Sequence, residues 1–211
     1  MHLIILFPIS NNNFLVYFAS IVIGYLIGSI PFGFLISRLR KIDIRNYGSK
    51  NIGFTNVYRT LGPLYAIPVL ILDVAKGFLP TFFASNLELT PSIVGVGAIL
   101  GHIFTPFLHF RGGKGVATTI GALLALTPMV LLVGIGIFTI VLALFSYVSL
   151  ASICLAISLP IISLIFYPNN LKLWLSIIII SLLIIISHRS NIKRLLDKTE
   201  PKFSLRKKIK Q

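Results

Sequence analysis

Three glycines and two cations interrupt a long apolar run at Arg111-Gly112-Gly113-Lys114-Gly115. Glycine has no Cβ, so this backbone can turn its N–H groups inward and form a nest for an anion. Lys114 adds a positive charge, and Val116 to Thr119 predict a helix start whose free N–H groups also favour an anion. A short basic loop between two membrane helices has the same composition. The stretch alone therefore supports phosphate binding and a plain connector equally. It is not a nucleotide P-loop, because Gly115 stands where that motif needs serine or threonine.

A second polar stretch, Arg38 to Leu61, combines six cations with a pattern of small polar residues. A basic loop lying on the membrane surface would explain the cations. It would not explain the spacing of the small polar side chains, so we interpret the stretch as a site-forming loop. That spacing is carried by Gly48-Ser49, Asn51, Gly53 and Thr55-Asn56.

A third cluster begins at His188, at the end of the last apolar segment, with Asn191 one helical turn later. His188 could donate to a phosphate or accept a proton. A histidine that only caps helix carbonyls would look the same. His102 and His109 flank the inner half of an earlier apolar segment, and we interpret both as packed, hydrogen-bonded core residues.

The composition is that of an integral membrane protein: the 211 residues are 56% hydrophobic and 11% charged, with a mean hydropathy of +0.95. The cations that give the net charge of +14 gather at the ends of apolar segments, where they meet anionic lipid. Nucleic acid is not expected as a partner. We predict one domain over residues 1–211, with a lead-in at 1–13 and a basic cytoplasmic tail at 190–211.

The apolar pattern predicts an all-α, polytopic fold with about seven transmembrane helices. The fourth segment is short for a crossing, so a re-entrant hairpin of the fourth and fifth stays open. Asp73 and Lys76 in the second span are three residues apart, on one helical face, and are predicted to pair. The predicted spans are Phe14–Ser37, Tyr65–Ser85, Ser92–Phe110, Val116–Leu126, Met129–Phe145, Leu150–Phe166 and Leu173–Ser187.

Seven crossings place the N-terminus outside and the C-terminus in the cytoplasm. The distribution of cations agrees, because Lys172 is the one lysine or arginine in the predicted outer loops, and inner loops are typically basic. The three polar clusters then share the cytoplasmic face. Arginine, lysine, glycine and hydroxyl groups with few carboxylates suit a phosphorylated substrate and not a divalent metal. No metal or cofactor is expected. A transporter for a phosphorylated metabolite is the alternative, although its polar groups should lie nearer the membrane midplane.

The clusters together resemble the bacterial membrane glycerol-3-phosphate acyltransferases that use acyl-phosphate as donor. The resemblance covers nearly the whole chain in order. Two departures are Lys50, where the family usually has glycine, and Phe54, where it usually has alanine. A third is Ser146, where a basic residue is common. The matching motifs are Gly28-Ser29-Ile30-Pro31-Phe32-Gly33, Asp43 to Arg59, Gly101 to Thr118, Tyr147 to Ser152 and His188 to Leu196.

The resemblance implies transfer of a fatty acyl group from acyl-phosphate to the 1-hydroxyl of sn-glycerol 3-phosphate, giving 1-acyl-sn-glycerol 3-phosphate and phosphate. It implies a seven-helix protein of the bacterial cytoplasmic (inner) membrane with its site facing the cytoplasm. The soluble enzyme that makes acyl-phosphate is a candidate partner. Carried over by position, the residues that line the site are Ser49, Arg59, Lys114, His188 and Asn191, and those that help to hold phosphate are Thr55, Asn56, Gly112, Gly113 and Gly115.

The proton of the attacking hydroxyl has two candidate acceptors, the donor's own phosphate and His188. Soluble-loop glycerolipid acyltransferases use a histidine followed five residues later by aspartate. Here the residues five after His109 and His188 are Lys114 and Lys193. The sequence therefore predicts a site without a conventional histidine-carboxylate base.

Overall fold

The computed structural model describes residues 13–203, and this part of the chain contains helices and no strand. The predicted lead-in lies outside the described residues except for Asn13, and so does the end of the basic tail. Short 3₁₀ turns lie at Ile44–Asn46, Ala84–Leu87 and Pro106–Leu108. The helices are α1 (Asn13–Gly28), α2 (Phe32–Arg38), α3 (Phe54–Leu61), α4 (Pro63–Phe83), α5 (Pro91–Ile103), α6 (Val116–Leu126), α7 (Pro128–Phe145), α8 (Val148–Phe166), α9 (Leu171–Ser187) and α10 (Arg189–Leu196).

The first predicted span, Phe14 to Ser37, is confirmed as an apolar segment long enough to cross a membrane, Phe14–Arg38, but it is not one continuous helix. α1 ends at Gly28 and α2 begins at Phe32, because Pro31 has no N–H and disfavours helical backbone at Ile30. The Ile30 carbonyl accepts a hydrogen bond from Lys76 Nζ at 2.8 Å. Lys76 also lies 2.8 Å from the Asp73 carboxylate, which confirms the predicted pair.

Five helical segments are long and apolar enough to cross a membrane, and α9 with α10 forms a sixth if the 55° bend between them is ignored. α6 has only 11 residues. The chain is therefore a multi-pass helical membrane protein, and the predicted count of seven crossings stays a prediction. α5 stops at Ile103, earlier than the predicted Phe110, because Pro106 disfavours helix at Thr105.

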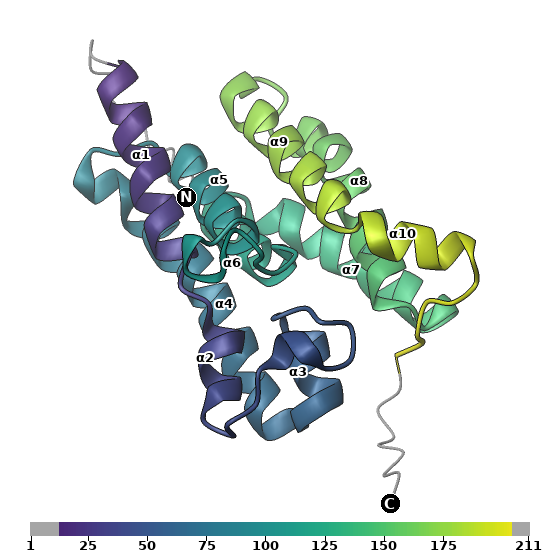
Figure 1. Cartoon of the computed structure of the whole chain (residues 1–211). Helices are drawn as coiled ribbons and strands as arrows, with labels where there is room; N and C mark the ends of the chain where they lie inside the picture. Colours follow the sequence, from purple (N-terminus) through teal and green to yellow (C-terminus); the bar gives the residue numbers. More distant parts are fainter. Residues whose placement is uncertain (1–12, 204–211) are drawn as a thin grey trace, which may run out of the picture.

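Close helix contacts join residues far apart in the sequence (Figure 1): α1 packs along α5, α6 along α4, and α8 against both α7 and α9. Cβ atoms at Gly24 and Gly28 would meet the backbone of Val94 and Ala98. This glycine pair therefore lets α1 and α5 pack closely against each other.

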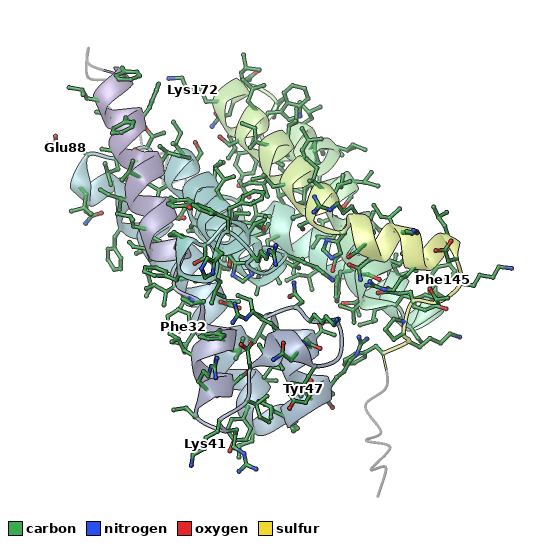
Figure 2. The ribbon with its side chains drawn as sticks, viewed as in Figure 1. Phe32, Lys41, Tyr47, Glu88, Phe145 and Lys172 are labelled. Atoms are coloured by element: carbon green, nitrogen blue, oxygen red, sulfur yellow. The ribbon has the colours of Figure 1, made fainter. Side chains whose placement is uncertain are left out.

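The helices define two ends of the molecule. Figure 2 shows Glu88 and Lys172 at one end and Lys41 and Tyr47 at the other. Helices α2 and α3 and the loop between them lie at the second end (Figure 1). The polar stretch from Arg38 to Leu61 is thus presented at one end of the bundle.

Candidate active site

Three separated stretches of sequence meet at one cavity of about 420 Å³. Ser49 comes from the loop before α3, Lys114 from the loop before α6, and His188 from the junction of α9 and α10. The predicted convergence of the three polar clusters is therefore confirmed. The other predicted residues on the cavity wall are Thr55, Asn56, Arg59, Gly115 and Asn191.

The loop that carries Lys114 is fixed on both sides by hydrogen bonds. The N–H groups of Gly112 and Gly113 donate to the carbonyls of Ile103 (2.9 Å) and His102 (3.0 Å). On the other side, the Ser187 hydroxyl donates to the Lys114 carbonyl at 3.0 Å. A preorganised loop of this kind holds its cation in place before an anion arrives.

Gly112 and Gly113 do not line the cavity, which corrects the prediction that they hold phosphate. Their N–H groups are already used, and a Cβ on either residue would meet His102. Their role is to let the loop lie directly on α5. Gly115 does line the cavity, and its φ of +82° is a conformation that favours glycine.

Lys114 lines the cavity, whereas Arg111, the other cation of this loop, does not. Among residues 13–203, no carboxylate lies within 4 Å of its ammonium. Burial lowers the pKa of Lys114 to about 8, with Arg194 and Arg59 acting in the same direction and Glu200 opposing them. The ammonium is thus a half-buried cation whose charge an incoming phosphate would balance.

Two helices begin at the cavity wall. Phe54 and Thr55 at the start of α3, and Val116 and Ala117 at the start of α6, all line it. The first N–H groups of a helix have no partner within the helix, and the helix dipole is positive at this end. The predicted helix start at Val116 is confirmed. Both helix ends add to the attraction for an anion.

The Asn56 side chain is buried beneath the polar loop, only 2% exposed, and makes hydrogen bonds to the loop backbone. Its Oδ1 accepts from the Ser49 N–H (2.9 Å), and its Nδ2 donates to the carbonyls of Asn51 (2.8 Å) and Tyr47 (3.0 Å). The side chain is therefore occupied within the loop. Its predicted contact with phosphate is corrected to a role in positioning Ser49.

His188 and Asn191 lie on successive turns at the start of α10, and both are buried. The His188 Nδ1–H donates to the Ile184 carbonyl at 2.9 Å, which leaves Nε2 as the ring nitrogen free to accept. The Asn191 Oδ1 is buried and has no hydrogen-bond partner in the described part of the chain. Such an orphaned acceptor on a cavity wall suits a ligand hydroxyl.

Glu200 was not identified from the sequence, although it lines the same cavity. Its carboxylate accepts from the Ser149 hydroxyl (2.6 Å), Asn191 Nδ2 (2.7 Å) and Arg194 Nε (2.7 Å). Burial acts to raise the pKa of Glu200, but these three hydrogen bonds outweigh it and hold the pKa below its usual value. The available signal was an acidic residue within a basic tail, where Asp197 and Glu200 are the two carboxylates.

Residues 197–203, here called the strap, return from α10 across the mouth of the cavity. The Phe203 N–H donates to the Ser146 carbonyl at 2.7 Å, and the Phe203 ring packs on Tyr58 with centroids 5.8 Å apart. An Arg59 Nη2–H donates to the Pro201 carbonyl at 3.3 Å. The strap thus connects α3 to the start of α8, so the described tail forms part of the site wall.

The two histidines interpreted as core residues behave differently. His102 is 4% exposed, which confirms that it is a packed core residue. Its Nδ1 lies 3.6 Å from Asp73 Oδ1 and makes no hydrogen bond in the described part of the chain, so the predicted hydrogen bond is not seen. His109 is exposed, with a φ of +54°, so its prediction is wrong. The loop after Pro106 turns His109 away from the helices. His102 and Asp73 both line the cavity, and no pattern in the sequence predicts that they meet there.

The other part of the cavity wall is apolar. Most of the side chains there come from α4, α6, α7 and α8, and Asp73 of α4 is the charged residue that these four helices contribute to the cavity wall. Ser152 of α8 lies among them, and its hydroxyl donates within its own helix to the Val148 carbonyl at 2.8 Å. The cavity wall therefore combines cationic and apolar residues, and the apolar ones are Leu70, Val116, Ile120, Ile135, Phe138, Leu142, Val148 and Leu155.

A helical multi-pass membrane protein with a cationic cavity is the class that the fold and site define. The family profile described as glycerol-3-phosphate acyltransferase matches residues 18–198. Proteins of that name from Fusobacterium nucleatum and Bacillus subtilis are 46% identical over 191 residues and 42% identical over 185 residues. These matches cover 89% and 86% of this chain, and 98% and 95% of the relatives. The chain belongs to the glycerol-3-phosphate acyltransferase family.

Two crystal structures of PlsY, an integral membrane glycerol 3-phosphate acyltransferase, are similar to this protein. The glycerol 3-phosphate form is 37% identical, with a TM-score of 0.83, and the match covers 89% of this chain and 96% of that one. The lysophosphatidic acid form is 36% identical, with a TM-score of 0.80 and coverage of 89% and 95%. An acyltransferase acting in phospholipid synthesis agrees with the site, and the alternative of a transporter finds no support here.

Proposed function

We propose that this enzyme transfers a fatty acyl group from acyl-phosphate to the 1-hydroxyl of sn-glycerol 3-phosphate, producing 1-acyl-sn-glycerol 3-phosphate and phosphate. The observation that carries the proposal is the two-part composition of the cavity wall, which combines Lys114 and the starts of α3 and α6 with apolar side chains of α7 and α8. A phosphate attached directly to an acyl chain matches these two parts. The crystal forms of PlsY named above hold the corresponding acceptor and product.

Acyl-phosphate is a mixed anhydride with phosphate as leaving group, so positioning supplies much of the catalysis, up to ~7–11 kcal/mol. In the reaction, the acyl carbon–oxygen bond to phosphate breaks as an ester bond to the 1-hydroxyl forms. Lys114 and Arg59 bind phosphate groups. Asn191 Oδ1 accepts from a hydroxyl of the glycerol, since it is a buried acceptor without another partner.

The proton of the 1-hydroxyl goes either to the phosphate of the donor or to His188 Nε2. His188→Asn separates these routes. A loss in kcat of about 100-fold or more would assign the proton to His188, in the range expected for general-base catalysis. A smaller loss would assign it to phosphate. No carboxylate within 4 Å of His188 occurs among residues 13–203, in keeping with the predicted absence of a histidine-carboxylate base.

We further propose that the protein is a single domain that crosses a bacterial cytoplasmic membrane seven times, with its N-terminus outside and the cavity facing the cytoplasm. The gathering of the basic loops at the end of the molecule that carries Lys41 supports this orientation (Figure 2). Cysteine substitutions at Lys41 and Glu88, labelled from the outside in whole cells, test it. We expect labelling at position 88 alone, and labelling at position 41 would reverse the topology.

The deciding experiment incubates purified protein with glycerol 3-phosphate and either acyl-phosphate or acyl-coenzyme A of the same chain length. We expect lysophosphatidate with acyl-phosphate only. Product from acyl-coenzyme A alone would overturn the choice of donor, and no product from either would overturn the reaction. Lys114→Ala should abolish turnover while the protein stays folded, and Lys172→Ala, at the other end of the molecule, is the matched control.

A further inference from the structure

A second hollow of about 400 Å³ adjoins the cavity at its mouth and is lined by Gly48, Ser49, Lys50, Arg59, Arg194 and Pro201. We call it the vestibule. Ser49, Arg59 and Arg194 line both hollows, so the vestibule leads directly to the cavity that contains Lys114. Any charged molecule that reaches Lys114 by this path passes the vestibule first.

The vestibule carries positive charge that the protein does not balance. Arg194 is paired with Glu200 at 2.7 Å. Lys50 and Arg59 have no carboxylate within 4 Å in the described part of the chain. Arg59 uses one N–H on the Pro201 carbonyl at 3.3 Å and keeps its other donors. Two uncompensated cations therefore face one small hollow, which is the charge pattern of a dianion subsite.

Lys50 adopts a backbone conformation that is unfavourable for residues other than glycine. Its φ is +58°, where glycine would be less strained. Within residues 13–203, its ammonium makes no hydrogen bond or ion pair that would stabilise the fold. Lys41 has the same backbone conformation, so what sets Lys50 apart is its place on the wall of the vestibule. At this position its role is the charge that it adds to the vestibule.

We propose that the vestibule is a second phosphate-binding subsite, in which Lys50 and Arg59 hold a phosphate dianion on its way to or from Lys114. This inference rests on the proposed function and deepens it, because the reaction brings two phosphate groups into one site. The ligand is a phosphomonoester or inorganic phosphate dianion. Glycerol 3-phosphate, acyl-phosphate and the released phosphate share this chemistry.

Lys50→Gly tests the subsite without endangering the fold, because glycine relieves the backbone strain. The chain provides a matched control in Lys41, another exposed lysine with a positive φ (+57°), which lines neither hollow. Lys41→Gly removes the same charge and the same strain. We expect Lys50→Gly, unlike Lys41→Gly, to raise the KM for a phosphorylated substrate about three- to tenfold at low salt, with kcat within about twofold. In about 1 M salt the difference should vanish.

Separate titrations of glycerol 3-phosphate and acyl-phosphate show which substrate uses the subsite, and product inhibition shows whether inorganic phosphate does. Equal KM values for Lys50→Gly and Lys41→Gly with both substrates and equal inhibition would overturn the proposal. So would a fall in kcat with KM unchanged. Binding of inorganic phosphate, followed by ³¹P NMR line broadening, needs no turnover. It tests the subsite even if acyl transfer is not observed, which keeps the two proposals distinguishable.

Discussion

The side-chain amide of Asn191 donates to Glu200 Oε1 at 2.7 Å, which ties helix α10 to the strap. A carboxylate only accepts hydrogen bonds, so this contact fixes which end of the Asn191 amide faces Glu200. The free end is therefore the oxygen, and it is buried on the cavity wall. Glu200 thus determines that Asn191 offers an acceptor, and not a donor, to the substrate.

Glu200→Gln should remove this control, because a glutamine amide both donates and accepts and lets Asn191 turn over. The change also leaves Arg194 without its partner. We expect kcat/KM for glycerol 3-phosphate to fall about tenfold or more and the free energy of unfolding to fall by about 1–3 kcal/mol. Steady-state kinetics and thermal unfolding in detergent measure the two effects. Glu88→Gln, an exposed glutamate at the other end of the molecule, should change neither, and a fully active Glu200→Gln would contradict the prediction.

Ser187→Ala should loosen the Lys114 loop without disturbing helix α9. The Ser187 hydroxyl has one hydrogen, which it shares between the Lys114 carbonyl at 3.0 Å and the Ile184 carbonyl of its own helix at 2.8 Å. Losing the first bond should lower kcat/KM by about three- to tenfold, equivalent to one ordinary hydrogen bond. Ser176→Ala, which removes only a bond within the same helix to the Lys172 carbonyl, is the control. If the two variants have equal activity, the Ser187 contact does not position Lys114.

Activity should decline on the alkaline side as Lys114 loses its proton. Burial lowers the pKa of this ammonium to about 8. The group is charged below that pH and becomes neutral as the pH rises through it, so binding of a phosphate dianion weakens above about pH 8. The pH profile of kcat/KM reports the pKa values of groups in the free enzyme, so it should show this alkaline decline, or limb. Lys114→Arg keeps a charge at higher pH, so whatever activity it retains should lack the limb. An alkaline limb unchanged in Lys114→Arg would assign it to another group.

Gly112→Ala should destabilise the protein, because its Cβ would meet the backbone carbonyls of His102 and Ile103, which cannot move aside. We expect a loss of about 1–3 kcal/mol in the free energy of unfolding, together with loss of activity. Gly136→Ala is the matched control, since a Cβ there meets nothing within 4 Å. It should be neutral or slightly stabilising, because alanine favours helix. Thermal unfolding in the same detergent measures the stability of both variants. Equal stability would contradict the packing role of Gly112.

The sequence by itself determined the membrane class, the positions of most helices and the three polar clusters at one end of the molecule. Apolar segment length and the distribution of cations are local properties, and the bilayer imposes them on each segment separately. The glycines and proline that mark the loops are equally local signals. The resemblance to the acyltransferase family, carried over position by position, then named Ser49, Arg59, Lys114, His188 and Asn191 before their arrangement was known.

Only the tertiary structure decided which of these residues are free to bind a ligand. Asn56, Gly112 and Gly113 are occupied by backbone groups, and no spacing rule predicts those partners. Glu200 reaches Ser149, 51 residues earlier, because the strap folds back across the cavity. The difference between His102 and His109 depends on how one loop turns after α5. Contacts between distant residues depend on the path of the whole chain, and an apolar helix surface in a membrane carries no periodic signal that reveals that path.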